Sequence, residues 1–276
     1  MLTALLRAEA HRVESASAIA CGLVVGLSLG LTGGGGAILA VPLLVYVLGL
    51  QFRAAVALSL AIVGATALYG ALAATRRGSV RWAAGLILGA SGALCAPLGA
   101  FLGARLSDRA SMLAFAVVML AVAVRMLRDR TAPDGSAPPW FACQPPMPGQ
   151  ALRISSRCAL KLLIAGALTG TLSGVFGVGG GFLLVPVLTA VLWLPMGIAT
   201  ATSLVAITVI SASALAANAS HLNSDASTTG LLVGFGALAG MTGSSLVRSR
   251  LDERSLRRTF GLLVLVAVAV TLAQSL

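Results

Sequence analysis

Long apolar stretches, separated by short polar turns, dominate the chain. They fall into two sets, at residues 16–31, 35–50, 54–74, 82–104 and 110–127, and again at residues 159–176, 179–194, 197–217, 226–247 and 259–275. The longer stretches match the roughly 20 residues that a helix needs to cross the hydrocarbon core of a bilayer. The pattern therefore predicts an all-α polytopic membrane protein.

Composition agrees with this interpretation. The chain of 276 residues is 58% hydrophobic and 10% charged, whereas a soluble domain is about 25% charged. The net charge is +11, but the arginines lie at the ends of apolar stretches, as the positive-inside bias of membrane proteins predicts. We therefore expect the lipid bilayer as a partner and no nucleic acid.

The four cysteines give no sign of a metal or cofactor site. Cys21, Cys95, Cys143 and Cys158 form no CxxC pair, and three of them lie in or at apolar stretches. This distribution supports neither a zinc site nor a disulfide framework. We expect no metal and no cofactor, and the sequence does not indicate an oligomeric state.

The two sets of apolar stretches are copies of each other. A shift of 144 residues superimposes Gly33 on Gly177, Gly36 on Gly180, Pro42 on Pro186 and Ser59 on Ser203. Shared leucines would arise by chance, but this spacing of Gly, Pro and Ser indicates a duplication. We divide the chain into an N-terminal repeat (1–127), a linker (128–157) that holds six of the ten prolines, and a C-terminal repeat (158–276).

The charges of the loops predict how the copies are oriented. If each half crosses the membrane an odd number of times, residues 76–81, the linker and residues 248–258 gather most of the arginines on one side. With an even number of crossings the bias nearly vanishes. Since cytoplasmic loops are rich in Lys and Arg, we expect an inverted repeat in the cell membrane, with a cytoplasmic linker and both termini outside.

A run of glycines interrupts each half. The glycines are Gly34, Gly35 and Gly36 in the first half and Gly179, Gly180 and Gly181 in the second. The stretches beside them are about 16 residues long, so each pair forms either two short tilted spans or a re-entrant hairpin. The sequence leaves both open, and both place short, Gly-broken helices near the centre.

A helix that starts after such a break presents free backbone N–H groups and the positive end of its dipole, which together bind an anion. We therefore expect these six glycines to bind substrate. For Gly22, Gly26 and Gly30, spaced by four, we favour close helix packing, which alanine would also permit.

Three hydroxyl residues follow the breaks. Ser59, Thr202 and Ser203 have side chains that can bind an oxyanion, or can bond to their own helix backbone instead, and the sequence leaves both open. No carboxylate lies deep in an apolar stretch, so we expect backbone dipoles and hydroxyls to hold the substrate. His221 lies near the predicted outer mouth, where we interpret it as part of a solvated loop.

The segments "GLSLGLTGGGGAILAVPLLVYVLGL" and "GTLSGVFGVGGGFLLVPVLTAVLWL", followed by "AVALSL" and "ATATSLVAI", resemble the TauE/SafE sulfite exporter family of membrane permeases. The resemblance covers both halves. It implies transport of sulfite, small organosulfur anions or carboxylates. The chain departs from the repeated pattern at Ala37, which replaces the third aligned glycine, so the two halves need not contribute equally.

These observations predict a secondary transporter of small anions and not an enzyme. A passive anion channel is the alternative. A more remote one is an intramembrane serine protease, in which Ser173 and His221 would meet on neighbouring helices.

Overall fold

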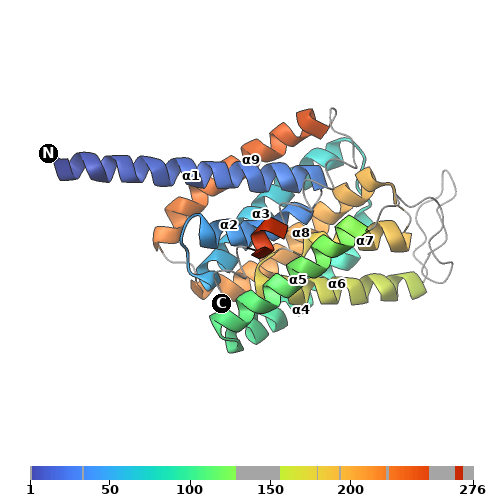
Figure 1. The fold of residues 1–276 in the computed structure, drawn as a ribbon. Helices are drawn as coiled ribbons and strands as arrows, with labels where there is room; N and C mark the ends of the chain where they lie inside the picture. Colours follow the sequence, from blue (N-terminus) through green and yellow to red (C-terminus); the bar gives the residue numbers. More distant parts are fainter. Residues whose placement is uncertain are drawn as a thin grey trace.

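The computed structural model describes residues 2–32, 34–128, 156–178, 180–192, 194–221, 224–248 and 265–269, and these are almost entirely helical (Figure 1). The elements are α1 (Leu2–Thr32), η1 (Gly35–Leu39), α2 (Ala40–Tyr46), α3 (Phe52–Arg76), α4 (Trp82–Arg105), α5 (Asp108–Arg128), α6 (Ser156–Phe176), α7 (Gly181–Leu192), α8 (Met196–Asn218), η2 (Ala219–His221) and α9 (Ser224–Arg248).

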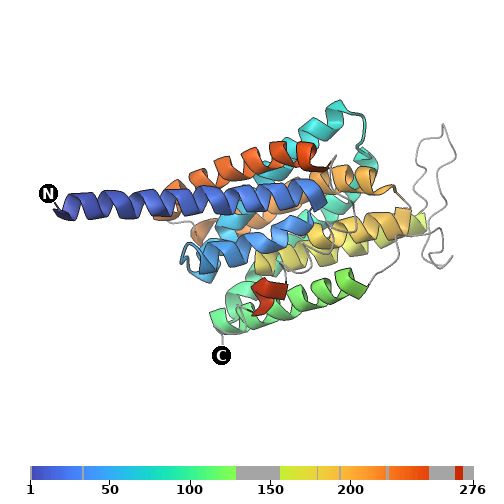
Figure 2. The ribbon, with the colours of Figure 1, turned by 45° about the horizontal axis from the view of Figure 1, so that its top comes forward.

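Each apolar stretch up to residue 247 corresponds to a helix or to a pair of short helices. The last stretch, 259–275, lies mostly outside the described residues. Within the described part of the chain, five helical segments are long and apolar enough to cross a membrane: Ser15–Thr32, Phe52–Arg76, Trp82–Arg105, Cys158–Phe176 and Met196–His221. The protein is therefore an all-helical, multi-pass membrane protein. α1 is longer than its apolar stretch, and its first turns extend beyond the other helices (Figures 1 and 2).

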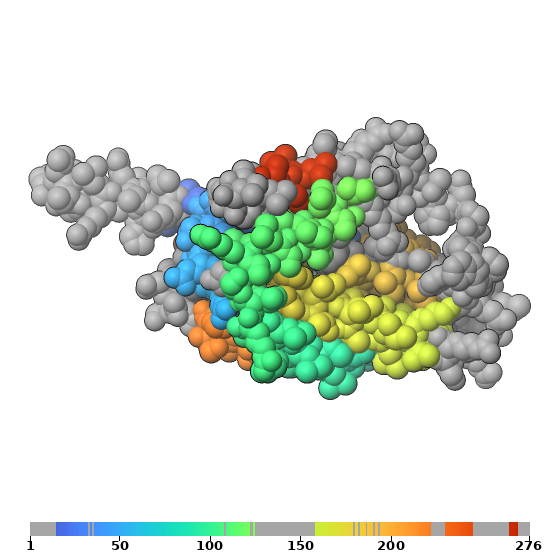
Figure 3. All heavy atoms as spheres, turned by 60° about the horizontal axis from the view of Figure 1, so that its bottom comes forward, coloured from blue at the N-terminus to red at the C-terminus, as the bar shows by residue number. Residues whose placement is uncertain are grey.

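Helices α3 and α8 form the centre of the bundle. In an apolar 18-residue window of each of these two spans 67% of the residues are buried, against 39–44% in the windows of the other three. Around this pair, α1 packs on α9 and α4 packs on α6. Figure 3 shows α4 and α6 side by side on one face of the molecule. The buried polar side chains of the bundle gather mainly on α3 and α8, where Ser59, Thr66, Thr202, Ser203 and Ser211 are fully enclosed.

Neighbouring residues fix the directions of these helices. The helices of four packed pairs run in the same direction: α3 with α9, α1 with α9, α4 with α6, and α4 with α8. Helices α3 and α8 run in opposite directions. The neighbouring residues are Leu58–Gly230 and Gly70–Met241 between α3 and α9, and Gly22–Val233 and Gly30–Ser244 between α1 and α9. They are Gly92–Gly170 and Gly103–Val175 between α4 and α6, and Gly85–Thr202 and Gly92–Ile210 between α4 and α8. Between α3 and α8 they are Gly64–Ser211 and Gly70–Leu204. Each of α1, α3 and α9 therefore runs opposite to its counterpart in the other half of the chain. The counterpart of α1 is α6, that of α3 is α8, and that of α9 is α4.

The spaced glycines of α1 serve helix packing, as the sequence predicts. A Cβ atom built on Gly26 would overlap the backbone carbonyl of Ala237 on α9. The expectation that alanine would also fit is therefore wrong at this position. The spacing of small residues predicts that two helices touch, but it does not predict how close their backbones come.

We accordingly expect Gly26→Ala to lower the stability of the folded protein by about 1–3 kcal/mol, the usual effect of overpacking a tight interface. Gly234→Ala is the matched control, because a Cβ on this α9 glycine would meet no atom within 4 Å, and alanine favours a helix by roughly 1 kcal/mol over glycine. Thermal unfolding in detergent measures both. Equal melting temperatures would contradict the observed α1–α9 contact.

The cysteines differ from expectation in one respect. Cys158, buried at the start of α6, is disulfide-bonded, while Cys21 and Cys95 are free. The spacing of cysteines along a chain does not reveal which thiols the fold brings together, so this bond could not be predicted from the sequence.

Candidate functional site

The glycine-rich segments of the two halves touch each other beside the central helices α3 and α8. α1 ends at Thr32 before the first break, and α7 begins at Gly181 after the second. A Cβ on Gly181 would lie 2.6 Å from Gly34 Cα, and one on Gly34 would lie 2.7 Å from the carbonyl oxygen of Gly181. Both glycines are buried. The backbones of the two halves of the chain are thus in direct contact here, and a side chain at either position would press on the backbone of the other.

Backbone conformation also requires glycine at three positions of the breaks. Gly34 has a φ of 132°, Gly177 of 69° and Gly180 of 65°, values that other residues adopt at a cost of roughly 1–2 kcal/mol. A Cβ on Gly177 would also lie 2.7 Å from Val56 Cα on α3. A Cβ on Gly180 would overlap the methyl group of Thr169.

The backbone N–H groups of the two breaks are satisfied differently. In the first break, the Gly36 N–H donates to Thr32 Oγ1 over 2.9 Å, and the Ala37 N–H donates to the Gly34 carbonyl over 3.2 Å. In the second break, no described group accepts a hydrogen bond from the N–H of Gly180 or Gly181, although both residues are buried. The start of α7 is therefore the electropositive part of this centre.

Of the three hydroxyl residues, Ser59 lies at the second break. Its Oγ donates toward the Gly177 carbonyl over 2.5 Å and toward its own helix at Val56 over 2.9 Å. Ser203, its counterpart, bonds to the Thr200 carbonyl over 2.8 Å. Thr202 Oγ1 instead accepts a hydrogen bond from the Arg81 N–H over 3.1 Å, so this side chain faces the start of α4.

The described contacts thus join Gly34 to Gly181, and they join Ser59 to Gly177, which precedes Gly180 and Gly181 in the chain. Gly35 and Gly36 begin η1, where Gly36 packs against the backbone of α1 at Ser28. Gly179 lies outside the described residues. Among the described residues, no group of three or more His, Cys, Asp or Glu side chains is arranged to hold a metal ion.

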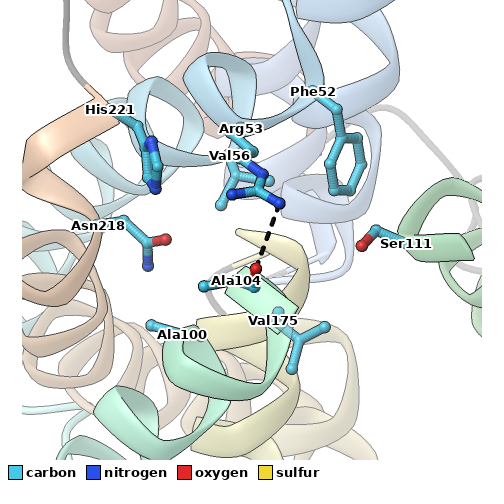
Figure 4. A pocket seen from close by; sticks show the side chains of 11 residues that line it. Phe52, Arg53, Val56, Ala100, Ala104, Ser111, Val175, Asn218 and His221 are labelled. Carbon is cyan, nitrogen blue, oxygen red and sulfur yellow. Dashed lines mark hydrogen bonds between the residues drawn. The ribbon is translucent and has the colours of Figure 1, made fainter. Parts of the chain in front are cut away.

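A second polar feature lies at the end of the bundle, where α3 begins and α4, α6 and α8 end (Figure 4). It is a small open pocket with a volume of about 20 Å³, lined by Arg53, Asn218 and His221 among mostly apolar residues. In the sequence, Arg53 stands just before an apolar stretch and Asn218 just after one, and neither position predicted a binding site. An asparagine that directly follows an apolar stretch was the available signal.

Ser173 and His221 do not form a catalytic pair. Ser173 Oγ is fully buried and has no hydrogen-bond partner among the described residues, while His221 lines the pocket at the end of the bundle. A serine nucleophile needs a base within hydrogen-bonding distance. The geometry therefore gives no support to a protease.

Comparisons with known proteins agree with a transport role. The profile of the family described as "Sulfite exporter TauE/SafE" matches residues 18–272. Two proteins named "Probable membrane transporter protein" from Xylella fastidiosa, strains 9a5c and Temecula1, are 34% and 33% identical to the chain over 91% of its length and 92% of theirs. No solved structure matches it. The match spans both halves of the chain and both runs of glycines, and the chain belongs to the sulfite exporter TauE/SafE family of membrane transporters.

Proposed function

We propose that the chain is a secondary transporter of small anions, namely sulfite, organosulfonates or related small carboxylates, which bind at the glycine breaks between the two repeats. The observation that carries this proposal is that the buried N–H groups of Gly180 and Gly181, at the start of α7, have no acceptor among the described residues. A buried donor without an acceptor costs about 1–3 kcal/mol. An anion bound there would supply the missing acceptor and would lie at the positive end of the helix dipole.

The surroundings favour an anion over a cation. Neither central span, Phe52–Arg76 nor Met196–His221, contains an aspartate or glutamate. Ionisable residues inside the membrane usually mark ion and proton pathways. With buried hydroxyls and backbone donors instead, the centre offers hydrogen bonds to an oxyanion and no carboxylate that would repel it.

We also propose that the halves form an inverted repeat that works by alternating access. The opposite directions of α1 and α6, α3 and α8, and α4 and α9 support this. Inverted repeats that meet at broken helices near the middle of the membrane are typical of secondary transporters. Because Gly34 and Gly181 touch, the described arrangement is closed, and substrate binding requires the two breaks to separate.

Flux into proteoliposomes tests the function. We expect the purified protein to carry radiolabelled sulfite, to saturate with concentration, and to exchange internal for external sulfite faster than it performs net uptake. Exchange acceleration is a property of carriers. Flux that is linear in concentration and shows no exchange acceleration would indicate the passive channel. No flux of sulfite, a sulfonate or acetate would contradict the proposal.

The orientation in the membrane is a separate prediction. In a variant without native cysteines, Ser136→Cys in the linker should react only with membrane-permeant thiol reagents, while Asn223→Cys should react with impermeant ones. The arginine-rich loops predict a cytoplasmic linker. The disulfide of Cys158 favours instead an oxidising compartment near that end of α6, and the labelling decides between the two. Labelling of Ser136→Cys by an impermeant reagent would reverse the predicted orientation.

A further inference from the structure

We infer that two buried serines, Ser173 on α6 and Ser211 on α8, donate hydrogen bonds to the carried oxyanion at the second glycine break, and that the anion binds at this break alone. The inference rests on the proposed function, because it assumes that a small oxyanion is carried. It names the side chains that hold the anion, and it gives the two halves of the chain different roles.

Both serine hydroxyls are enclosed and have no hydrogen-bond partner. Ser173 and Ser211 are 0% exposed, and in the described part of the chain theirs are the only buried side-chain oxygen or nitrogen atoms without a partner. Other buried hydroxyls donate to a carbonyl of their own helix three or four residues earlier, as at Thr66, Ser91 and Thr169. This is a common way for a hydroxyl in a helix to be satisfied. Ser173 and Ser211 each keep a donor that a bound anion can use.

Ser173 faces the second break from the α6 side. Thr169, Ser173 and Gly177 are spaced by four residues, so they lie on one face of the helix. The Thr169 methyl group meets the missing Cβ of Gly180 at one end of this face. Gly177 contacts Val56 on α3 at the other end. Ser173 lies between these two contacts, so its side chain projects toward the break.

Ser211 faces the same break from the α8 side. Ile207 lies one turn earlier on the same face of α8, and its Cδ1 is 2.6 Å from the position of a Cβ on Gly181. Ser211 itself packs on α3, where its Cβ is 3.2 Å from the position of a Cβ on Gly64. Its hydroxyl is therefore held between α3 and α8, one turn from the start of α7.

The two hydroxyls lie at similar positions along the bundle axis. Gly92 on α4 neighbours both Ile210 on α8 and Gly170 on α6, and these three helices run in the same direction. Ser211 is the next residue after Ile210, and Ser173 comes three residues after Gly170. At a rise of roughly 1.5 Å per residue, their positions along the axis differ by about 3 Å. Both serines thus border the same part of the second break.

The surroundings of the two serines suit an anion. The described helices α6, α7 and α8 contain no Asp or Glu, so no carboxylate competes for the hydroxyls or repels a negative charge. The N–H groups of Gly180 and Gly181 add two donors at the positive end of the α7 dipole. Hydroxyl and backbone donors together can bind an oxyanion without a cationic side chain.

The first half of the chain has no equivalent of either hydroxyl. The shift of 144 residues places Ser173 on Leu29 and Ser211 on Ala67, and both of these apolar side chains are also fully buried. Buried hydroxyls without partners therefore occur, in the part of the chain that the structure describes, only around the second break. We accordingly assign anion binding to the second break and packing to the first.

Equilibrium binding of ³⁵S-labelled sulfite to the purified full-length protein, together with melting temperatures in the absence of sulfite, tests the inference. We expect Ser173→Ala and Ser211→Ala each to weaken sulfite binding at least tenfold, because hydrogen bonds to an ionised group are the strong ones. Neither change should lower the melting temperature of the anion-free protein, because neither hydroxyl has a partner to lose. A serine with a structural role alone would show the reverse pattern.

Ser91→Ala is the matched control. Ser91 is also buried in a packed helix, but its hydroxyl donates to the Leu88 carbonyl over 3.1 Å. We expect this variant to keep its sulfite affinity within twofold of the wild-type value. The wild-type protein should bind one sulfite per chain, because the serine donors border one break only. Two bound sulfites per chain would contradict the assignment to the second break.

The results distinguish this inference from the proposed function. Unchanged sulfite affinity in both serine variants, with binding lost in Gly181→Ala, would overturn the role of the serines and leave the site at the break intact. Weakened binding in the serine variants of a protein that shows no flux would support the serines and contradict the transport role. A wild-type protein that binds neither sulfite nor a sulfonate would overturn both.

Discussion

Gly181→Ala is expected to reduce anion transport to the level of empty liposomes while leaving a folded protein in the membrane. Gly181 is the first residue of α7 and has no positive φ, so alanine does not strain its backbone. The added methyl would lie 2.6 Å from Gly34 Cα and 2.6 Å from Ile207 Cδ1. It would therefore fill the seam between the two repeats where we place the substrate.

The cost in stability should stay moderate. Overpacking at one position usually costs about 1–3 kcal/mol, and alanine at the start of a helix recovers part of this. The measurements are sulfite flux in proteoliposomes, membrane insertion and melting temperature, with Gly234→Ala as a control in open space. Transport by Gly181→Ala at the wild-type rate would show that the glycine breaks serve packing alone.

Gly180, the other glycine whose N–H has no acceptor among the described residues, is a poorer position for this experiment. From the sequence alone, a large side chain there would be expected to block the site and spare the fold. The structure gives Gly180 a φ of 65° and puts its missing Cβ against Thr169. A substitution would therefore strain the backbone as well as fill space, and lost transport would not identify the cause.

This contrast shows what the sequence determines about the centre and what it does not. Consecutive glycines predict that the helices break, and the repeated spacing of Gly, Pro and Ser predicts that the breaks correspond. Both inferences depend on local preferences. The contact between Gly34 and Gly181, and the capping of the Gly36 N–H by Thr32, depend on how distant segments pack. A single sequence carries no signal for them.

The same reason explains the two residues that sequence reasoning placed differently. Thr202 follows the second break along the chain, but helix rotation turns its hydroxyl toward Arg81 at the start of α4. Arg53 follows the first break and belongs to a pocket assembled from the ends of several helices. Proximity in sequence predicted a shared site for Thr202 and gave no role to Arg53, because the rotation of each helix is set by tertiary packing.

The second large effect is expected on stability, at Gly177. This residue follows the last turn of α6, and its N–H donates to the Ser173 carbonyl over 2.8 Å. A glycine with positive φ at this place is the common way to end a helix. Here the residue also touches the backbone of α3, since a Cβ would lie 2.7 Å from Val56 Cα and 2.8 Å from its carbonyl oxygen. Backbone atoms of a buried helix cannot move aside as a flexible side chain can.

Gly177→Ala should therefore add two costs, about 1–2 kcal/mol for the left-handed conformation and about 1–3 kcal/mol for overpacking. Gly78→Ala separates them, because Gly78 has nearly the same φ, 66° against 69°, but no atom within 4 Å of its missing Cβ. We expect Gly78→Ala to show only the first cost, and Gly177→Ala to show both, with a large fall in melting temperature and in the yield of folded protein. Equal melting temperatures for the two variants would mean that α3 does not press on the end of α6, and that the second break is not held where the structure places it.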